Sequence, residues 1–223
     1  MINNITSPHY SNIQTDYRLF ILQKNIRFFV ACFFLSWAIT ISATPQEDTR
    51  KGMEAFHEGD TVGAMQFYRK AAEEGYAPAQ EKLANILDKS ELNEEAILWF
   101  SKAAEQNNAE GQYGLGMMYL TGDGIDIDTE QGIGLITAAA EQGLFRAMVS
   151  MFHFFENGDH GLQVDLKQAV YWLEKMANSD NQWAIERIAK AYRNGELGLA
   201  ASEEKAVVWE GKLLKKPKSE SSQ

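Results

Sequence analysis

A small residue followed three positions later by a large apolar residue recurs at nearly regular intervals along this chain. In order, the pairs are Ala64 with Phe67, Ala96 with Trp99, Gly132 with Leu135, Ala169 with Trp172, and Ala206 with Trp209. The first members of successive pairs lie 32, 36, 37 and 37 residues apart. Sequence periods of about 20 to 50 residues are typical of repeat architectures, in which each unit packs only against its neighbours. The spacing therefore constrains the fold more than length or composition does.

Each repeat has the pattern of two helices. From residue 64 to residue 74, apolar residues recur at i, i+3, i+4, i+7 and i+8, which predicts a helix with one apolar face. Gly75 is expected to end this helix, and a second helix is predicted from about residue 77 to 87. Later first helices are expected to begin at two capping boxes and one N-cap, namely Asp128-x-x-Gln131, Asp165-x-x-Gln168 and Ser202. Because one such hairpin cannot bury its apolar face alone, we predict an all-α fold, a right-handed α-solenoid of stacked antiparallel helix hairpins.

Further elements repeat in a fixed order after each pair. Ala103-Ala104-Glu105-Gln106 recurs as Ala139-Ala140-Glu141-Gln142, and Leu115-Gly116-Met117-Met118-Tyr119 is followed by Gly122-Asp123-Gly124. In these motifs the chain resembles the Sel1-like repeat family, a relative of the tetratricopeptide repeats, over about residues 60–214. The positions that carry the repeat are Ala64, Phe67, Ala96, Trp99, Gly116, Tyr119, Ala169, Trp172, Tyr192 and Trp209. The resemblance implies a bacterial protein with an adaptor role in assembly, signalling or envelope processes.

The third repeat departs from this pattern. Leu135 stands where other repeats carry Trp or Phe, and Phe152 stands at the small position that Gly116 and Ala189 hold elsewhere. We interpret this as an exchange of volume, in which the second helix of the repeat supplies the aromatic side chain that its first helix lacks.

The N-terminal part of the chain has a different composition. Residues 28–41 contain no charged residue and follow Lys24 and Arg27. A basic start, a short apolar core and small residues predict a secretory signal peptide, cleaved near Ala43. The apolar core is shorter than the roughly 20 residues that a membrane-spanning helix needs. The alternative is an uncleaved anchor.

The expected organisation has three parts. Residues 1–43 form the lead and signal peptide, residues 44–214 the repeat solenoid, and residues 215–223 a disordered tail. Within the solenoid we expect an opening helix over 46–58, repeats near 61–93, 94–128, 129–165 and 166–202, and a terminal helix over 203–214. The only Cys of the chain, Cys32, lies in the signal. The mature chain would then contain no thiol, which suits an oxidising compartment.

Composition and motifs argue against several classes of function. Lys and Arg number 21 against 31 Asp and Glu, a net charge of −10, and nucleic-acid binding needs clustered cations. The sequence contains no nucleophile elbow, phosphate loop or dinucleotide motif. Counted from Asp126, the sixth and twelfth positions, where an EF-hand requires Gly and Glu, hold Gln131 and Thr137. His153 and His160 lack metal-ligand spacing. We therefore predict no catalytic residue, no cofactor and no metal.

Trp183 is the strongest candidate for contact with a partner. It aligns with Pro78, Glu110 and Arg146, positions that face solvent in the repeat pattern. Exposed Trp side chains often anchor interfaces, although Trp183 could instead pack against Tyr171 or a nearby loop. We predict that the partner-binding residues are Trp183, Arg146 and Tyr76.

These observations favour a binding protein. We expect a non-catalytic protein–protein interaction scaffold or adaptor that holds a protein or peptide partner in the cell envelope or outside the cell, with the periplasm favoured over the extracellular space. Two alternatives remain. One is an enzyme or enzyme regulator of cell-wall or polysaccharide metabolism, and the other is a membrane-anchored assembly factor that keeps residues 19–41 as its anchor.

Overall fold

Ten α-helices and one 3-10 turn make up the part of the chain that the structure, a computed structural model, describes, which is residues 43–213. In order, the elements are α2 (Pro45–His57), α3 (Thr61–Glu73), α4 (Ala77–Lys89), α5 (Asn93–Glu105), α6 (Ala109–Thr121), α7 (Thr129–Glu141), α8 (Phe145–Asn157), the 3-10 turn η1 (Asp159–Gly161), α9 (Leu166–Asn178), α10 (Gln182–Asn194) and α11 (Glu203–Leu213). The predicted signal peptide and C-terminal tail lie outside the described residues. None of the helices in 43–213 has the length and apolar character that crossing a membrane requires.

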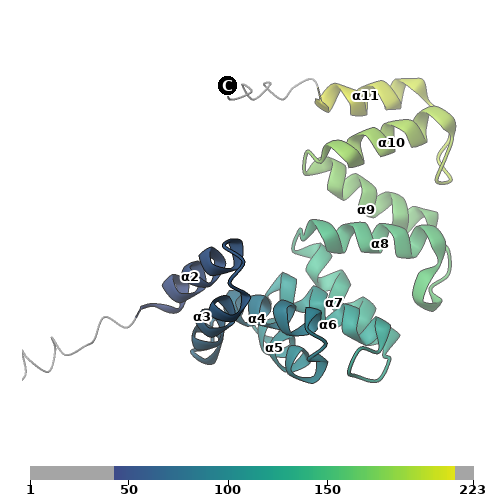
Figure 1. The fold of residues 1–223 in the computed structure, drawn as a ribbon. Coiled ribbons are helices and arrows are strands. Elements are labelled where there is room, and N and C mark those ends of the chain that lie inside the picture. Colours follow the sequence, from purple (N-terminus) through teal and green to yellow (C-terminus); the bar gives the residue numbers. More distant parts are fainter. Residues whose placement is uncertain (1–42, 214–223) are drawn as a thin grey trace, which may run out of the picture. The chain divides into compact units, whose positions relative to one another are not determined.

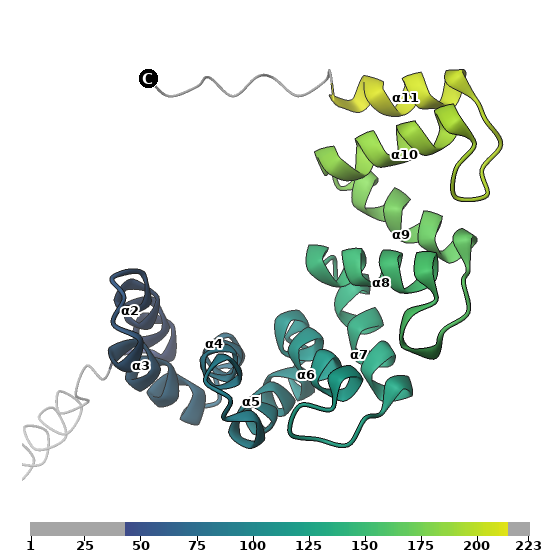
Figure 2. The same cartoon turned by 45° about the vertical axis from the view of Figure 1, so that its right-hand side comes forward.

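Consecutive helices pack against one another from α2 to α11 (Figure 1). The pairs α3–α4, α5–α6, α7–α8 and α9–α10 are the helix hairpins of successive repeats, and α2 and α11 flank them. The prediction of an all-α solenoid of stacked hairpins is confirmed. The second helices α4, α6 and α8 lie on the same side of the stack (Figure 2).

The loops between repeats are held at two points. The side chains of Asp128 and Asp165 accept hydrogen bonds from backbone N–H groups in the first turns of α7 and α9, and Ser202 does the same for α11. Each N-cap also donates its own N–H to the carbonyl of Tyr119, Phe155 or Tyr192 in the preceding helix, over 3.0, 2.9 and 2.7 Å. The predicted N-caps are confirmed. Since a carbonyl already accepts the N–H of each Asp, the Gln side chains do not close the predicted capping boxes.

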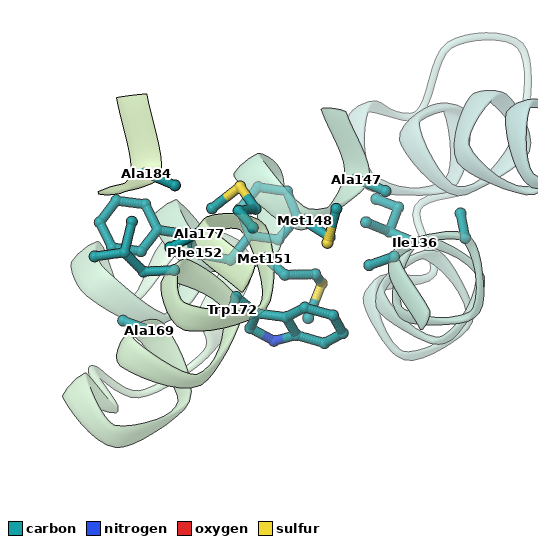
Figure 3. Close-up of a cluster of buried hydrophobic side chains, with 14 of the residues drawn as sticks. Ile136, Ala147, Met148, Met151, Phe152, Ala169, Trp172, Ala177 and Ala184 are labelled. Carbon is teal, nitrogen blue, oxygen red and sulfur yellow. The ribbon is translucent and has the colours of Figure 1, made fainter. Parts of the chain in front are cut away.

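The buried apolar side chains form two clusters rather than one core. The N-terminal cluster runs from Ala64 and Tyr68 on α3 to Met118 on α6. The C-terminal cluster runs from Leu120 on α6 to Ile188 on α10, and Figure 3 shows part of it around Trp172. Each cluster contains residues from neighbouring repeats, as expected for a quasi-one-dimensional stack.

Two glycines let α6 and α7 approach closely where one cluster gives way to the other. A Cβ atom built on Gly116 would lie 2.9 Å from the carbonyl oxygen of Gly132. A Cβ atom on Gly132 would lie 2.9 Å from the carbonyl oxygen of Gly116 and 2.7 Å from a methyl carbon of Leu120. Real Cβ atoms do not approach backbone oxygens this closely, so larger residues would force the helices apart.

The predicted exchange of volume in the third repeat is wrong. Phe152 is buried, with 1% of its surface exposed, but it belongs to the C-terminal cluster, whereas Leu135 packs against the N-terminal cluster. The Phe152 ring meets the Trp183 ring of α10 edge-on, with 5.9 Å between centroids. Phe152 therefore fills space between its own repeat and the next, which the sequence pattern within one repeat does not reveal.

Candidate functional site

A groove formed by two adjoining hollows runs across the second helices of the first three repeats. The first hollow has a volume of about 250 Å³ and is lined by Phe56, Tyr68, Glu81, Lys82, Asn85, Ile86, Lys89, Glu110 and Arg146. The second has a volume of about 300 Å³ and is lined by Asn85, Asp88, Phe100, Tyr113, Gly114, Met117, Met118, Thr121, Asp123 and Arg146. Because Asn85 and Arg146 line both hollows, we treat them as one surface and call it the groove.

Helix α4 places three polar side chains along the groove. Glu81, Asn85 and Asp88 follow one another at i, i+4 and i+7, which puts them on one face of the helix. Glu81 is 4% exposed, and its carboxylate lies 3.2 Å from the Lys82 ammonium and accepts a hydrogen bond from the Asn85 amide. Burial raises the pKa of Glu81, and Lys82 only partly opposes that shift. Keeping a charged carboxylate buried costs free energy, and groups whose pKa is shifted in this way are typical of functional sites.

Arg146 links α6 and α8 between the two hollows. Its guanidinium pairs with the carboxylate of Glu110 and lies over the ring of Tyr113, 4.6 Å from the centroid. The Tyr113 hydroxyl lies 3.2 Å from the hydroxyl oxygen of Ser150, also on α8. These contacts fix the spacing of α6 and α8, and so the shape of the groove at its centre.

The second hollow joins an acidic rim to an apolar floor. Asp88 and Asp123 form the rim, and the Thr121 hydroxyl donates to Asp123 over 2.7 Å. Burial raises the pKa of Asp88, and the negative charge of Asp123 adds to this rise. The floor contains the Phe100 ring, which approaches α6 where Gly114 has no side chain; a Cβ atom there would lie 2.4 Å from the ring.

The predicted partner-binding residues do not lie together. Arg146 lines both hollows. Tyr76 precedes α4, is half-buried against the N-terminal cluster, and lines neither hollow. Trp183, on α10, is 42% exposed, meets Phe152 edge-on and also lines neither hollow. Sequence reasoning missed Glu81, Asn85 and Asp88, although their i, i+4, i+7 spacing is a signal that could have found them.

The residues predicted to carry the repeat occupy the interior to different degrees. The small residues Ala64, Ala96, Gly116 and Ala169 are buried, as are Trp99 and Trp172. Phe67, Tyr119, Tyr192 and Trp209 are half-buried. Within residues 43–213, no three His, Cys, Asp or Glu side chains are placed to hold a metal ion together. The loop after α6 turns at Gly122 and Gly124, both at positive φ, and ends at the N-cap Asp128.

Comparison with known families decides the identity of these repeats. The model of the Sel1 repeat matches residues 55–76, 78–108, 109–144, 146–181 and 184–209. The chain belongs to the Sel1 repeat family. Sel1 repeats are generally non-catalytic scaffolds, and proteins built from them generally bind other proteins.

Curated relatives share the Sel1 repeats but are longer. The ERAD-associated E3 ubiquitin-protein ligase component HRD3A of Arabidopsis thaliana is 29% identical over 148 residues, which covers 59% of this chain and 22% of that protein. The chitin synthase regulator SKT5 of Saccharomyces cerevisiae is 27% identical over 147 residues, covering 60% of this chain and 21% of SKT5. The uncharacterized protein NMB1327 of Neisseria meningitidis is 27% identical over 148 residues, covering 51% of this chain and 30% of that protein. The chain therefore spans less than a third of these relatives.

Solved structures show the same architecture. A protective antigen of uropathogenic Escherichia coli, c5321, superimposes with a TM-score of 0.63 at 28% identity, covering 77% of this chain and 38% of c5321. A Sel1 repeat protein from Oxalobacter formigenes superimposes with a TM-score of 0.61 at 24% identity, covering 75% of this chain and 71% of that protein. The second likeness is evidence for the fold alone.

Proposed function

We propose that this Sel1 repeat protein is a non-catalytic scaffold that holds a segment of a partner protein in the groove. The observation that carries the proposal is the groove itself, which extends over three successive repeats and is lined by polar side chains from α4, α6 and α8. The carboxylate of Glu81 in this groove is buried, and burying a charged group costs free energy. Concave surfaces that span several repeats are the usual binding surfaces of solenoid proteins.

The relatives support a role in binding rather than in chemistry. HRD3A is a component of a ubiquitin-protein ligase, and SKT5 is a regulator of chitin synthase. Both names describe proteins that act together with an enzyme. The SKT5 likeness favours a second candidate function, in which the partner of this chain is an enzyme of polysaccharide metabolism and the chain regulates it.

We further propose that the protein acts in the cell envelope or outside the cell. The basis is the sequence, in which the uncharged residues 28–41 follow Lys24 and Arg27 and precede small residues. N-terminal sequencing of the protein from its native cells tests this. A new N-terminus near Thr44 supports export with cleavage, and an intact N-terminus on membrane-bound protein supports the anchored alternative. An intact N-terminus on protein recovered from the cytoplasm would contradict the proposal.

Site-specific crosslinking tests the groove as the binding surface. A photo-activated amino acid is placed at Lys89, an exposed residue that lines the first hollow, or at Leu98, an exposed residue of α5 that lines neither hollow. In the native cells, we expect one defined partner to crosslink from position 89 and not from position 98. Equal crosslinking from both positions would contradict the proposal.

Binding of the purified partner provides the second half of the test. Asn85→Arg fills the part of the groove that both hollows share, and Leu98→Arg adds the same side chain outside it. We expect Asn85→Arg to weaken binding about ten-fold or more and Leu98→Arg to leave it unchanged. An Asn85→Arg variant that melts like the wild type and binds like the wild type would exclude the groove as the site.

A further inference from the structure

The carboxylates of the groove differ in how their charges are balanced. Glu81 has Lys82 beside it, and Glu110 pairs with Arg146, so each has a cation of the chain within ion-pair distance. Asp88 and Asp123 line the second hollow, and within residues 43–213 neither has an ion-pair partner. Lys89 acts on Asp88 only from beyond ion-pair distance, and Arg146, which also lines this hollow, is paired with Glu110. The two neighbouring carboxylates therefore keep a net negative charge, and this end of the groove favours a positively charged occupant.

The floor of the second hollow limits which cation fits. Phe100 and Met118, which are almost fully buried, and the half-buried Met117 also line this hollow. Lys and Arg side chains combine an apolar stem with a charged head, and they bury the stem along apolar surface while the head reaches a polar partner. A side chain of this kind matches both the floor and the rim, whereas a small inorganic cation would use only the rim.

The first hollow contributes polar groups whose hydrogen-bonding capacity is not fully used within the described part of the chain. Tyr68 is 2% exposed and lines this hollow, yet its hydroxyl has no hydrogen-bond partner among the described residues. The amide of Asn85 donates to Glu81, and no group in the described part of the chain donates to its carbonyl oxygen. Neither oxygen is among the buried atoms that lack a partner, so both are accessible from the hollow and can hydrogen-bond a polar occupant. The backbone of an extended peptide supplies the N–H and C=O groups needed.

We propose that the groove binds an extended segment of a partner protein that carries a Lys or Arg, with the stem of that side chain against Met117 and its charged head between Asp88 and Asp123. The backbone of the segment continues past Asn85 toward Tyr68. This inference rests on the proposed function, and it adds the chemistry of the bound segment. The net charge of −10 favours the same class of partner, because it attracts basic segments at long range.

A display library of random nonapeptides tests the proposal even while the partner is unidentified. The library is selected in parallel against the full chain, an Asp88→Asn/Asp123→Asn variant and an Asp126→Asn/Glu105→Gln variant. The control variant removes the same two charges at exposed positions that line neither hollow. Melting curves of all three proteins confirm that each variant is folded.

We expect the wild type and the control variant to enrich peptides with a Lys or Arg at one fixed position, and the Asp88→Asn/Asp123→Asn variant to lose that enrichment. A synthetic copy of an enriched peptide should bind the wild type about ten-fold or more tightly than a copy with norleucine at the basic position. Both peptides should bind the Asp88→Asn/Asp123→Asn variant equally.

Two failures have different meanings. If the wild type selects peptides that lack a basic residue, or if the enrichment survives in Asp88→Asn/Asp123→Asn, the inference is wrong and the groove still binds peptides. If the wild type selects no peptide above background, both this inference and the proposed function are overturned.

Discussion

The two hydrophobic clusters fill the same repeat position in different ways. Sixteen residues after the small residue that begins each repeat, the N-terminal repeats carry Gln80 and Gln112, whereas the next two carry Met148 and Ile185. All four side chains are buried. Among the described residues, every buried polar or charged side chain lies in α2, α4 or α6, and none lies beyond Gln112. The same backbone position therefore tolerates an amide in one half and an apolar side chain in the other.

The buried amides of the N-terminal half connect successive repeats. Gln106 at the end of α5 donates to Gln80 over 2.8 Å, and Gln142 at the end of α7 donates to Gln112 over 2.7 Å. Gln80 in turn donates to the carbonyl of Ala72 over 3.1 Å. Such bonds contribute only about 1 kcal/mol each, but a buried amide without its partner is costly. The N-terminal half thus gains specificity from polar contacts, and the C-terminal half gains stability from apolar packing.

This difference coincides with the position of the groove. Apart from Arg146 of α8, all the residues that line the groove lie in the N-terminal half, and so does its buried carboxylate. Binding surfaces need polar groups that packing would otherwise exclude, so they are drawn from the less stable parts of a fold. We infer that the C-terminal cluster supplies stability and the N-terminal repeats supply binding.

The largest expected effect comes from removing an aromatic ring in the C-terminal cluster. Phe152→Ala should lower the free energy of unfolding by about 3 to 5 kcal/mol, as other truncations of buried aromatic residues do. Phe145→Ala removes the same ring from the same helix at a position that is 42% exposed, and should change stability far less. Chemical denaturation measures both. Equal losses for the two variants would mean that the C-terminal cluster does not have the role assigned to it.

The junction between the clusters gives an intermediate effect. Gly132→Ala places a methyl group against the backbone of α6 and should destabilise the protein by about 1 to 3 kcal/mol. Gly134→Ala, on the same helix, meets nothing within 4 Å and should stabilise the protein by up to about 1 kcal/mol. Thermal melting distinguishes the two signs, and a stabilising Gly132→Ala would refute the close approach of α6 and α7.

A substitution that gives the N-terminal half the residue found at the equivalent position of the C-terminal half tests the comparison further. Gln112→Ala should destabilise the protein by about 1 to 3 kcal/mol, because it leaves a cavity and frees the amide of Gln142. Gln112→Met copies the residue at the equivalent position 148 and should recover much of that loss. If Gln112→Met is as unstable as Gln112→Ala in denaturant unfolding, the amide pair contributes more than apolar packing can replace.

The smallest effect is a pH dependence that originates at Glu81. Because the pKa of Glu81 is raised above its ordinary value of 4.5, the folded state binds more protons than the unfolded state in that pH range. The wild type should therefore lose stability relative to Glu81→Gln as the pH rises from below 4.5 through the raised pKa. The exposed carboxylate variant Glu105→Gln is the control and should show a smaller change. A difference between wild type and Glu81→Gln that is constant with pH would contradict the shift.

The sequence pattern predicts the helices much better than it predicts the groove. The pairs that begin at Ala64 and Ala96 repeat within one chain, so periodicity reveals them, and the N-caps Asp128 and Asp165 follow from short-range chemistry. The pair of Glu110 with Arg146 depends instead on how far apart successive second helices lie. The sequence pattern aligns Glu110 and Arg146 at the same position of successive repeats, but it could not show that their side chains form an ion pair. For the same reason it could not show that Phe152 packs toward Trp183 rather than toward Leu135.

Hydrogen exchange followed by mass spectrometry, with and without a peptide selected against the groove, tests most directly whether stability and binding are divided between the two halves. We predict that in the free protein the amides of α8 to α10 exchange most slowly. We also predict that the peptide increases protection in α4 and α6 and leaves α9 and α10 unchanged. Slowest exchange in α4 and α6 of the free protein, or peptide-induced protection confined to α9 and α10, would contradict the account.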